Sequence, residues 1–212
     1  MKTKAAIVYE RSGKFTMDQI EISEPKDDEV LVRIAATGIC HTDLAGREQY
    51  LPIPPERAFP AVFGHEGAGV VEKIGARVTK VEPGDHVALG WNSCGVCPSC
   101  KSGNEPYCDN LFLCNFNGAR PDGSATLRKG DQVIHGSFFC QSSFANFALS
   151  NERTIVKVRK DVHPNRSVMK SSTSFIKYSE ASGRTPCTAN SPALAIVHIR
   201  PLCQTIFVAA RS

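Results

Sequence analysis

The chain has 212 residues, of which 42% are hydrophobic and 22% are charged. These proportions match soluble globular proteins and exclude a disordered, collagen-like or coiled-coil chain. No stretch reaches the roughly 18 consecutive apolar residues that span a bilayer, and the first residues lack the apolar run of a signal peptide. We therefore expect a cytoplasmic protein that does not enter a membrane, with its nine cysteines as metal ligands or thiols rather than disulfides.

The net charge of +4 comes entirely from the C-terminal part of the chain. Residues 1–160 contain 19 Lys and Arg and 19 Asp and Glu, whereas residues 161–212 contain 6 and 2. A domain without net charge lacks the excess of basic residues that attracts the phosphates of a nucleic acid. We expect no nucleic-acid partner.

The first 160 residues are rich in short segments of β-branched residues, separated by Gly, Pro and acidic turns. One short helix is expected at residues 41–49. Strands are expected at residues 3–10, 15–22, 29–36, 67–74, 77–81, 86–90, 142–149 and 154–159. The pattern predicts a mainly β, mostly antiparallel domain over residues 1–160.

Residues 161–212 differ from the rest in composition. They contain 12 Ser and Thr, four Pro and a single glycine, Gly183. We expect an atypical, Ser/Thr-rich basic tail that is not a folded domain. A shifted reading frame or an alternative exon at about codon 161 would explain the change. A natural short protein with its own C-terminal function is the alternative.

The strongest motif is a run of four cysteines, C-G-V-C-P-S-C-K-S-G-N-E-P-Y-C, at residues 94–108. Four thiolates in one short loop can complete a tetrahedral Zn²⁺ shell that has no open position. We therefore predict a structural zinc, which replaces a core that this hydrophilic loop cannot build. Its ligands would be Cys94, Cys97, Cys100 and Cys108. An iron–sulfur cluster is the alternative, although its cysteines usually follow a different spacing.

A second set of residues comes from G-I-C-H-T-D at residues 38–43 and G-H-E-G-A-G at residues 64–69. Cys40, His65 and Glu66 are the types of residue that bind a catalytic zinc through three protein ligands and leave a fourth position open. Thr42 would offer a hydroxyl for proton removal. Asp43 could orient the ligand imidazole.

With V-E-P-G-D-H-V-A-L at residues 81–89 and F-C-Q-S-S-F-A-N-F-A at residues 139–148, these motifs resemble the zinc-dependent medium-chain alcohol dehydrogenases, and among them the aryl- and benzyl-alcohol dehydrogenases. The resemblance covers residues 1–160 and implies a GroES-like β-barrel catalytic domain with a structural-zinc loop. The family oxidises alcohols to aldehydes with NAD(P), so it implies a small alcohol or aldehyde as substrate. It also allows a homo-oligomer.

The same resemblance implies a role for each residue of the second set. Cys40 and His65 would bind the catalytic zinc, and Glu66 would be an alternate or supporting ligand. Thr42 would relay the substrate proton, and His41 would face the cofactor pyrophosphate.

The resemblance ends near Lys160. Family members continue into a Gly-Cys-Gly segment that supplies the third zinc ligand, and then into a Rossmann nucleotide domain. Here residues 170–173 read Lys-Ser-Ser-Thr, and the chain contains no G-x-G-x-x-G motif. We expect the Rossmann domain to be absent and the catalytic zinc site to be weakened. The remaining cysteines are interpreted as free or packing thiols: Cys114, Cys140, Cys187 and Cys203.

Two functions stay open. The first is a zinc-dependent alcohol dehydrogenase in an incomplete form, and the second is a non-catalytic, zinc-stabilised GroES-like binding module. A zinc-ribbon nucleic-acid binder is disfavoured, because residues 1–160 carry no net charge.

Overall fold

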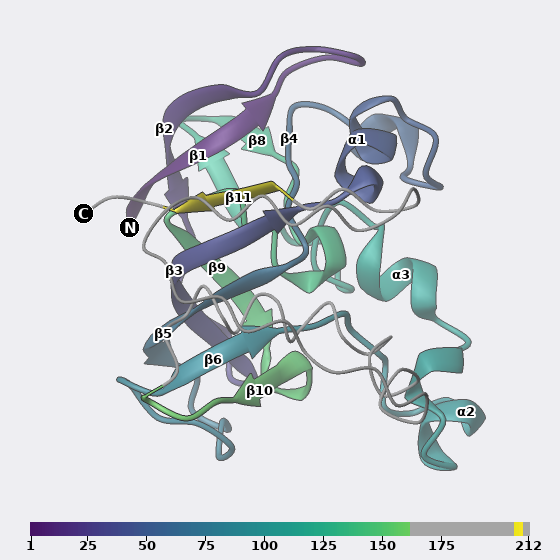
Figure 1. The fold of residues 1–212 in the computed structure, drawn as a ribbon. Coiled ribbons are helices and arrows are strands. Elements are labelled where there is room, and N and C mark those ends of the chain that lie inside the picture. The colour runs from purple at the N-terminus through teal and green to yellow at the C-terminus, as the bar shows by residue number, and fades with distance from the viewer. Residues whose placement is uncertain (162–205, 210–212) are drawn as a thin grey trace, which may run out of the picture.

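The computed structural model describes residues 1–161 and 206–209. Figure 1 shows strands gathered on one side of the molecule and the short helices on the other. In chain order the elements are β1 (Lys2–Val8), β2 (Thr16–Ile22), β3 (Glu29–Ile39), α1 (His41–Arg47), β4 (Ala61–Val62), β5 (Gly67–Ile74), β6 (His86–Leu89), α2 (Pro98–Lys101), α3 (Leu111–Asn115), β7 (Leu127–Lys129), β8 (Gln132–Ile134), β9 (Phe147–Asn151), β10 (Ile155–Lys157) and β11 (Ile206–Ala209). Single 3-10 turns lie at Pro55–Arg57, Glu105–Tyr107, Phe138–Cys140 and Glu152–Thr154.

The strands form two antiparallel sheets, with the orders β4-β1-β2-β7-β8 and β10-β6-β5-β3-β11. Strand β3 is the long central strand of the second sheet. One of its edges pairs with β5. The other edge pairs with β9 over residues 29–33 and with β11 over residues 36–39. The mainly β, antiparallel fold that the sequence predicts is confirmed.

Strand β3 is apolar on both faces because it separates two cores. Val30 and Val32 pack into a cluster that also contains Val71, Val87 and Ile155. Leu31, which points to the opposite face, packs into a second cluster, whose other members include Ile7, Ile20, Leu127 and Ile134. A strand that is buried on both sides needs a continuous apolar run, which explains the sequence V-L-V at its start.

Two of the expected strands are wrong in whole or in part. Residues 77–81 form a loop, although Val78 and Val81 are buried in the first core. The Glu152 carboxylate accepts hydrogen bonds from the backbone N–H groups of Thr79 and Lys80, so a side chain replaces the partner strand there. The valines at positions 78 and 81 are apolar because this loop packs on the core, and not because the segment pairs as a strand.

The expected strand at residues 142–149 begins only at Phe147. The preceding backbone cannot continue a sheet, because Ser137, Phe139, Cys140 and Ser142 have left-handed φ angles of 59°, 51°, 57° and 52°. The N–H groups of Ser143 and Phe144 donate instead to the carbonyls of Gly64 and Phe63. This irregular segment is thereby pressed against the turn that carries His65.

The hairpin of β7 and β8 was not expected from the sequence. Its strands pair from Leu127↔Ile134 to Lys129↔Gln132, so Gly130 and Asp131 form a two-residue turn, and Gly130 has a φ of 57°. A Gly-Asp pair between short β-type runs is a hairpin signal that could have revealed it.

The expected helix at residues 41–49 is confirmed as α1, which ends at Arg47. The predicted domain boundary at residue 160 and the prediction of an unfolded tail fall mostly outside the described residues. Of the tail, only residues 161 and 206–209 are described, and residues 206–209 pair with β3.

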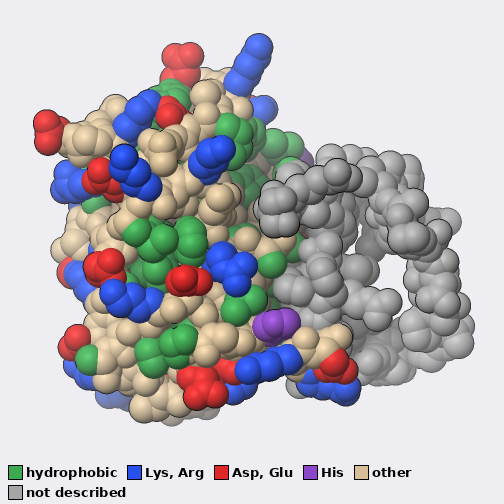
Figure 2. All heavy atoms as spheres, turned by 90° about the vertical axis from the view of Figure 1, so that its left-hand side faces the viewer, with side chains coloured by type: hydrophobic (Ala, Val, Ile, Leu, Met, Phe, Trp, Pro, Cys, Tyr) green, Lys and Arg blue, Asp and Glu red, His purple; other side chains and the backbone are tan. Residues whose placement is uncertain are grey.

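Figure 2 shows acidic and basic side chains interspersed on one face of the described residues, in keeping with the balanced charge of residues 1–160. No helix in the described part of the chain has the length and apolar character to cross a membrane.

Phe63 packs helix α1 against the core of the fold. Its ring is 1% exposed and packs under α1, where a β carbon on Gly46 would lie 2.7 Å from its Cε1 atom. We predict that Phe63→Ala lowers the free energy of unfolding by about 3–5 kcal/mol, the usual cost of emptying a buried aromatic site. Tyr50→Ala, a control at a side chain that is 73% exposed, should leave denaturant unfolding nearly unchanged. Equal losses in the two variants would contradict this assignment of the core.

Candidate metal centres

Asp43 holds together the end of β3, the start of α1 and the loop before β5. Its carboxylate is fully buried and accepts hydrogen bonds from the backbone N–H of Cys40 and of Gly64, both at 2.9 Å. The same carboxylate lies 3.0 Å from Nδ1 of His65. Because Nδ1 faces Asp43, the ring presents Nε2 to the neighbouring space.

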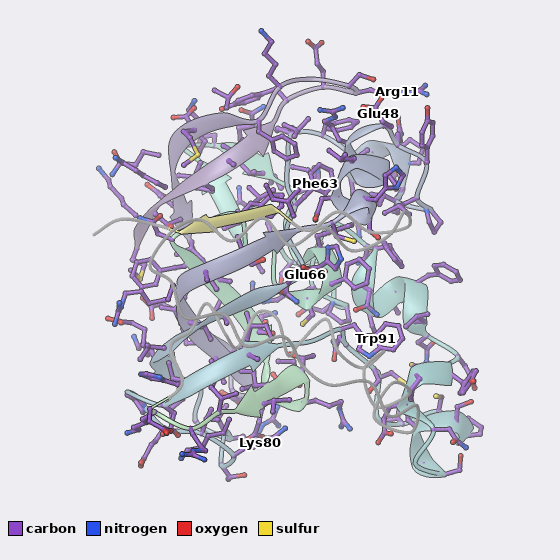
Figure 3. All side chains as sticks on the ribbon, viewed as in Figure 1. Arg11, Glu48, Phe63, Glu66, Lys80 and Trp91 are labelled. Carbon is purple, nitrogen blue, oxygen red and sulfur yellow. The ribbon has the colours of Figure 1, made fainter. Side chains whose placement is uncertain are left out.

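Cys40, His65 and Glu66 each offer one ligand atom, and these atoms lie within 4.8 Å of one another. One carboxylate oxygen of Glu66, Oε2, is buried and has no hydrogen-bond partner among the described residues. An orphaned carboxylate oxygen is costly to bury and is satisfied by a cation. Figure 3 shows Glu66 in the interior, between the strands and the helices α1 and α3.

The protonation of this cluster also favours positive charge. Burial lowers the pKa of His65, but its hydrogen bonds to Asp43 and Cys40 outweigh that effect and raise the pKa to about 10. Burial raises the pKa of the Glu66 carboxyl. These raised pKa values mean that the site holds protons when no metal is bound, and zinc would have to displace them, because a metal binds the neutral imidazole and the ionised carboxylate. The donor set of one thiol, one imidazole and one carboxylate fits a zinc ion held by three protein ligands.

Gln141 is a residue of this site that the sequence did not reveal. Its Oε1 atom accepts a hydrogen bond from the N–H of Gly67 at 3.0 Å, and its Nε2 atom donates to the carbonyls of His65 at 2.9 Å and Gly90 at 3.2 Å. The amide therefore fixes the backbone on both sides of Glu66. Gln141 belongs to the F-C-Q-S-S-F run, but nothing in the spacing shows that it reaches back to His65.

An aromatic wall covers one side of His65. The ring of Phe139 stacks on the imidazole with 4.6 Å between centroids, and Phe138 meets it edge-on at 5.7 Å. Phe116 packs against Phe139 at 4.9 Å and leads outward to Phe112, which is 60% exposed. The left-handed backbone at Ser137 and Phe139 brings two successive rings to the same imidazole.

Thr42 and His41 are the two remaining residues predicted for this site. The Thr42 hydroxyl lies 3.6 Å from the sulfur of Cys40, so it stands beside the candidate ligands. His41 is exposed at the first residue of α1. Residues 170–173, Cys187 and Cys203 lie outside the described part of the chain.

The four cysteines of the 94–108 loop form the second centre. One sulfur from each lies within 4.8 Å of the others, and the sulfurs of Cys94 and Cys100 are 4.0 Å apart. Figure 1 shows the loop around α2 projecting from the body of the sheets. A donor set of four sulfurs with no other ligand type fits a closed tetrahedral zinc shell.

Backbone and side-chain N–H groups point at these sulfurs. Cys97 donates to Cys94 at 3.4 Å, Cys100 to Cys97 at 3.5 Å, and Cys94 to Cys108 at 3.3 Å. The Asn110 amide, with the backbone N–H groups of Val96 and Cys97, lowers the pKa of Cys94 to about 6. These groups stabilise the thiolate of Cys94, the form of cysteine that binds metal. Burial and the three neighbouring cysteines instead raise the pKa of Cys100 to about 12, so four thiolates together call for a cation between them.

Comparisons with known proteins agree with this geometry. Residues 26–160 match the family model of the alcohol dehydrogenase GroES-like domain. The chain belongs to the zinc-dependent medium-chain alcohol dehydrogenase family. It is 41% identical over 163 residues to a geraniol dehydrogenase from Castellaniella defragrans, which covers 76% of this chain and 42% of that protein.

Two solved structures of family members are also similar. A benzyl alcohol dehydrogenase from Acinetobacter calcoaceticus has 44% identity and a TM-score of 0.71, and the match covers 77% of this chain and 43% of that one. A zinc-binding domain protein from Burkholderia ambifaria has 45% identity and a TM-score of 0.72, with 76% and 43% covered. The chain thus spans about two fifths of the length of these relatives. Its four-cysteine group and its Cys40, His65 and Glu66 group are consistent with the structural and catalytic zinc sites of the family.

The two centres should respond differently to loss of one ligand. We predict that Cys97→Ser removes one tightly held zinc per chain and makes residues 94–108 sensitive to proteolysis, because metal binding is also folding energy for that loop. Cys40→Ser should leave this zinc and the loop's protease resistance in place. Zinc content after mild chelation, with limited proteolysis, tests both. Equal effects of the two substitutions would mean that the closed structural site and the open catalytic site are wrongly assigned.

The carboxylate of Asp43 should matter both for stability and for the Cys40 centre. Asp43→Asn replaces an acceptor-only group by one that cannot accept all of its present hydrogen bonds. We predict a loss of about 1.5–3 kcal/mol in the free energy of unfolding, as for other buried bonds to charged groups. Cobalt(II) titration should also show weaker binding at Cys40 and His65. Asp131→Asn, at an exposed carboxylate in the turn between β7 and β8, is the control and should change neither measurement.

Proposed function

We propose that residues 1–160 are the zinc-binding catalytic half of an alcohol dehydrogenase that oxidises aromatic or similarly unsaturated primary alcohols. The observation that carries the proposal is a three-residue ligand set that lies beside a wall of phenylalanine rings. Three protein ligands would leave the fourth position of a tetrahedral zinc for substrate or water. Zinc and a nicotinamide, when bound, supply the Lewis acid for the substrate oxygen and the acceptor for the hydride.

Other residues of the chain orient a zinc ligand, receive a proton and line the site. Asp43 fixes the ring of His65 so that only Nε2 is available as a ligand. The Thr42 hydroxyl, next to Cys40, receives the proton that leaves the alcohol and passes it toward the surface. Phe116, Phe138 and Phe139 exclude water from one side of the site, and the partly exposed rings of Phe116 and Phe139 offer flat apolar contact for a substrate ring.

The names of the relatives support this choice of substrate. The similar proteins include a geraniol dehydrogenase and a benzyl alcohol dehydrogenase, and both names denote alcohols with π electrons near the hydroxyl. The phenylalanines around His65 are the feature of this chain that would recognise such a group. We also propose that His41, exposed at the start of α1, faces the cofactor phosphates.

A chimaera tests the proposal. We predict that residues 1–160, joined to the nucleotide-binding half of a full-length relative, oxidise benzyl alcohol with reduction of NAD or NADP. Thr42→Val in the chimaera should lower kcat by about 10²–10⁴, the usual worth of a positioned proton acceptor, whereas Thr42→Ser should keep most of the activity. Cys40→Ala should abolish turnover and leave NADH fluorescence enhancement intact. A chimaera that binds NADH but does not oxidise any alcohol would refute the proposal.

The second candidate, a non-catalytic zinc-stabilised binding module, is favoured by one observation. The 212 residues contain no G-x-G-x-x-G motif to hold a dinucleotide pyrophosphate. On this reading the unmodified 212-residue protein should neither oxidise benzyl alcohol nor change NADH fluorescence in a saturable way. Clear turnover by that protein would exclude the module.

A further inference from the structure

The zinc loop meets the body of the fold at an arginine. Arg153 lies in the 3-10 turn Glu152–Thr154, and its guanidinium packs directly on the backbone of Gly95. A β carbon on Gly95 would lie 2.1 Å from a terminal guanidinium nitrogen and 2.3 Å from Cζ. Gly95 also has a left-handed φ of 71°. The guanidinium thus occupies the space that a side chain at position 95 would need.

The turn that carries Arg153 is fixed to its neighbours. The side chain of Asn151 accepts a hydrogen bond from the N–H of Arg153 at 3.0 Å, and the carbonyl of Thr154 accepts one from Gly90 at 2.9 Å. The hydroxyls of Ser150 and Thr154 are 2.7 Å apart in the interior. Because this turn is fixed, the side chain of Arg153 is held against the four-cysteine loop.

The two sides of this contact carry opposite charges. Four thiolates around one Zn²⁺ leave an excess of two negative charges. Lys101 and Glu105 of the loop cancel each other, and Asp109, which directly follows the loop, adds one more negative charge. Arg153 forms no ion pair with any carboxylate of residues 1–161. A cation without a carboxylate partner in the described chain therefore lies against an anionic loop.

The contact also falls beside a candidate ligand. Gly95 directly follows Cys94 in the chain, and the φ of 71° at Gly95 belongs to the backbone that leads from Cys94 to Cys97. Arg153 is itself exposed, and its guanidinium lies on the backbone that carries the candidate ligand Cys94. Its positive charge is therefore placed beside the thiolates, where salt in the solvent can screen it.

We infer that Arg153 is a cationic clamp on the four-cysteine loop, which slows the release of its zinc and ties the loop to the body of the fold. The role is one of positioning and charge, since Arg153 is not among the four candidate ligands. It concerns metal retention and does not depend on the proposed catalytic function.

Zinc release from the full 212-residue protein tests the clamp. The zinc-loaded protein is mixed with a chromogenic chelator at low ionic strength, at chelator concentrations where the rate no longer rises. Arg153→Met, which keeps an extended side chain without charge, should release zinc about fivefold faster than the unmodified chain. Arg153→Lys should stay within about twofold, and Arg153→Glu should release zinc fastest of all. In about 1 M salt the difference between Arg153 and Met should shrink, because the screening length falls to about 3 Å.

Arg128→Met is the matched control, because Arg128 is exposed on β7 of the other sheet and its loss changes the net charge equally. Its release rate should equal that of the unmodified protein. The inference is overturned if Arg153→Met behaves like the unmodified chain, if Arg153→Lys is as fast as Arg153→Met, or if Arg128→Met has the same effect. If Arg153→Met holds no zinc at all, Arg153→Lys decides: retention supports the clamp, and loss refutes it.

Discussion

The buried carboxylate of Asp43 is the interaction on which the open metal centre depends. Cys40 lies between strand β3 and helix α1, and His65 precedes strand β5, so the two candidate ligands come from separate segments of the chain. Asp43 connects them by accepting from the N–H of Cys40 and of Gly64 and by facing Nδ1 of His65. One group therefore fixes the position of the thiol, the turn of the backbone and the orientation of the imidazole. A carboxylate can do this in the interior because it has about four acceptor sites, of which the three contacts use three.

A second layer of contacts holds the other side of the same site. Gln141 ties the carbonyl of His65 and the N–H of Gly67 to a segment whose backbone is left-handed at four positions. Such backbone is unfavourable for non-glycine residues and persists only where the surroundings fix it. Here it brings Phe138 and Phe139 onto His65, so that an apolar wall and a polar ligand set share one small region.

The four-cysteine loop follows a different principle from the rest of the molecule. The two cores on either side of β3 are built from aliphatic side chains, whereas the loop has little apolar interior beyond its cysteines. Metal ligation and N–H···S hydrogen bonds supply the order that burial supplies elsewhere. Such a unit can be rigid within itself and still need attachment, and the packing of Arg153 on Gly95 provides one contact between the loop and the sheets.

The sequence by itself determined those features whose parts lie close together along the chain. The four cysteines fall within residues 94–108, and α1 and most strands follow from local alternation and turn residues. Cys40 and His65 could be paired from sequence only through the resemblance of their motifs to a family. Tertiary structure alone decided that residues 77–81 form a loop, and that Gln141, the phenylalanines around His65 and Arg153 meet these centres. Their contacts join segments more than 50 residues apart, through single side chains and left-handed backbone. Neither leaves a periodic signal, because periodicity records only which face of an element is buried.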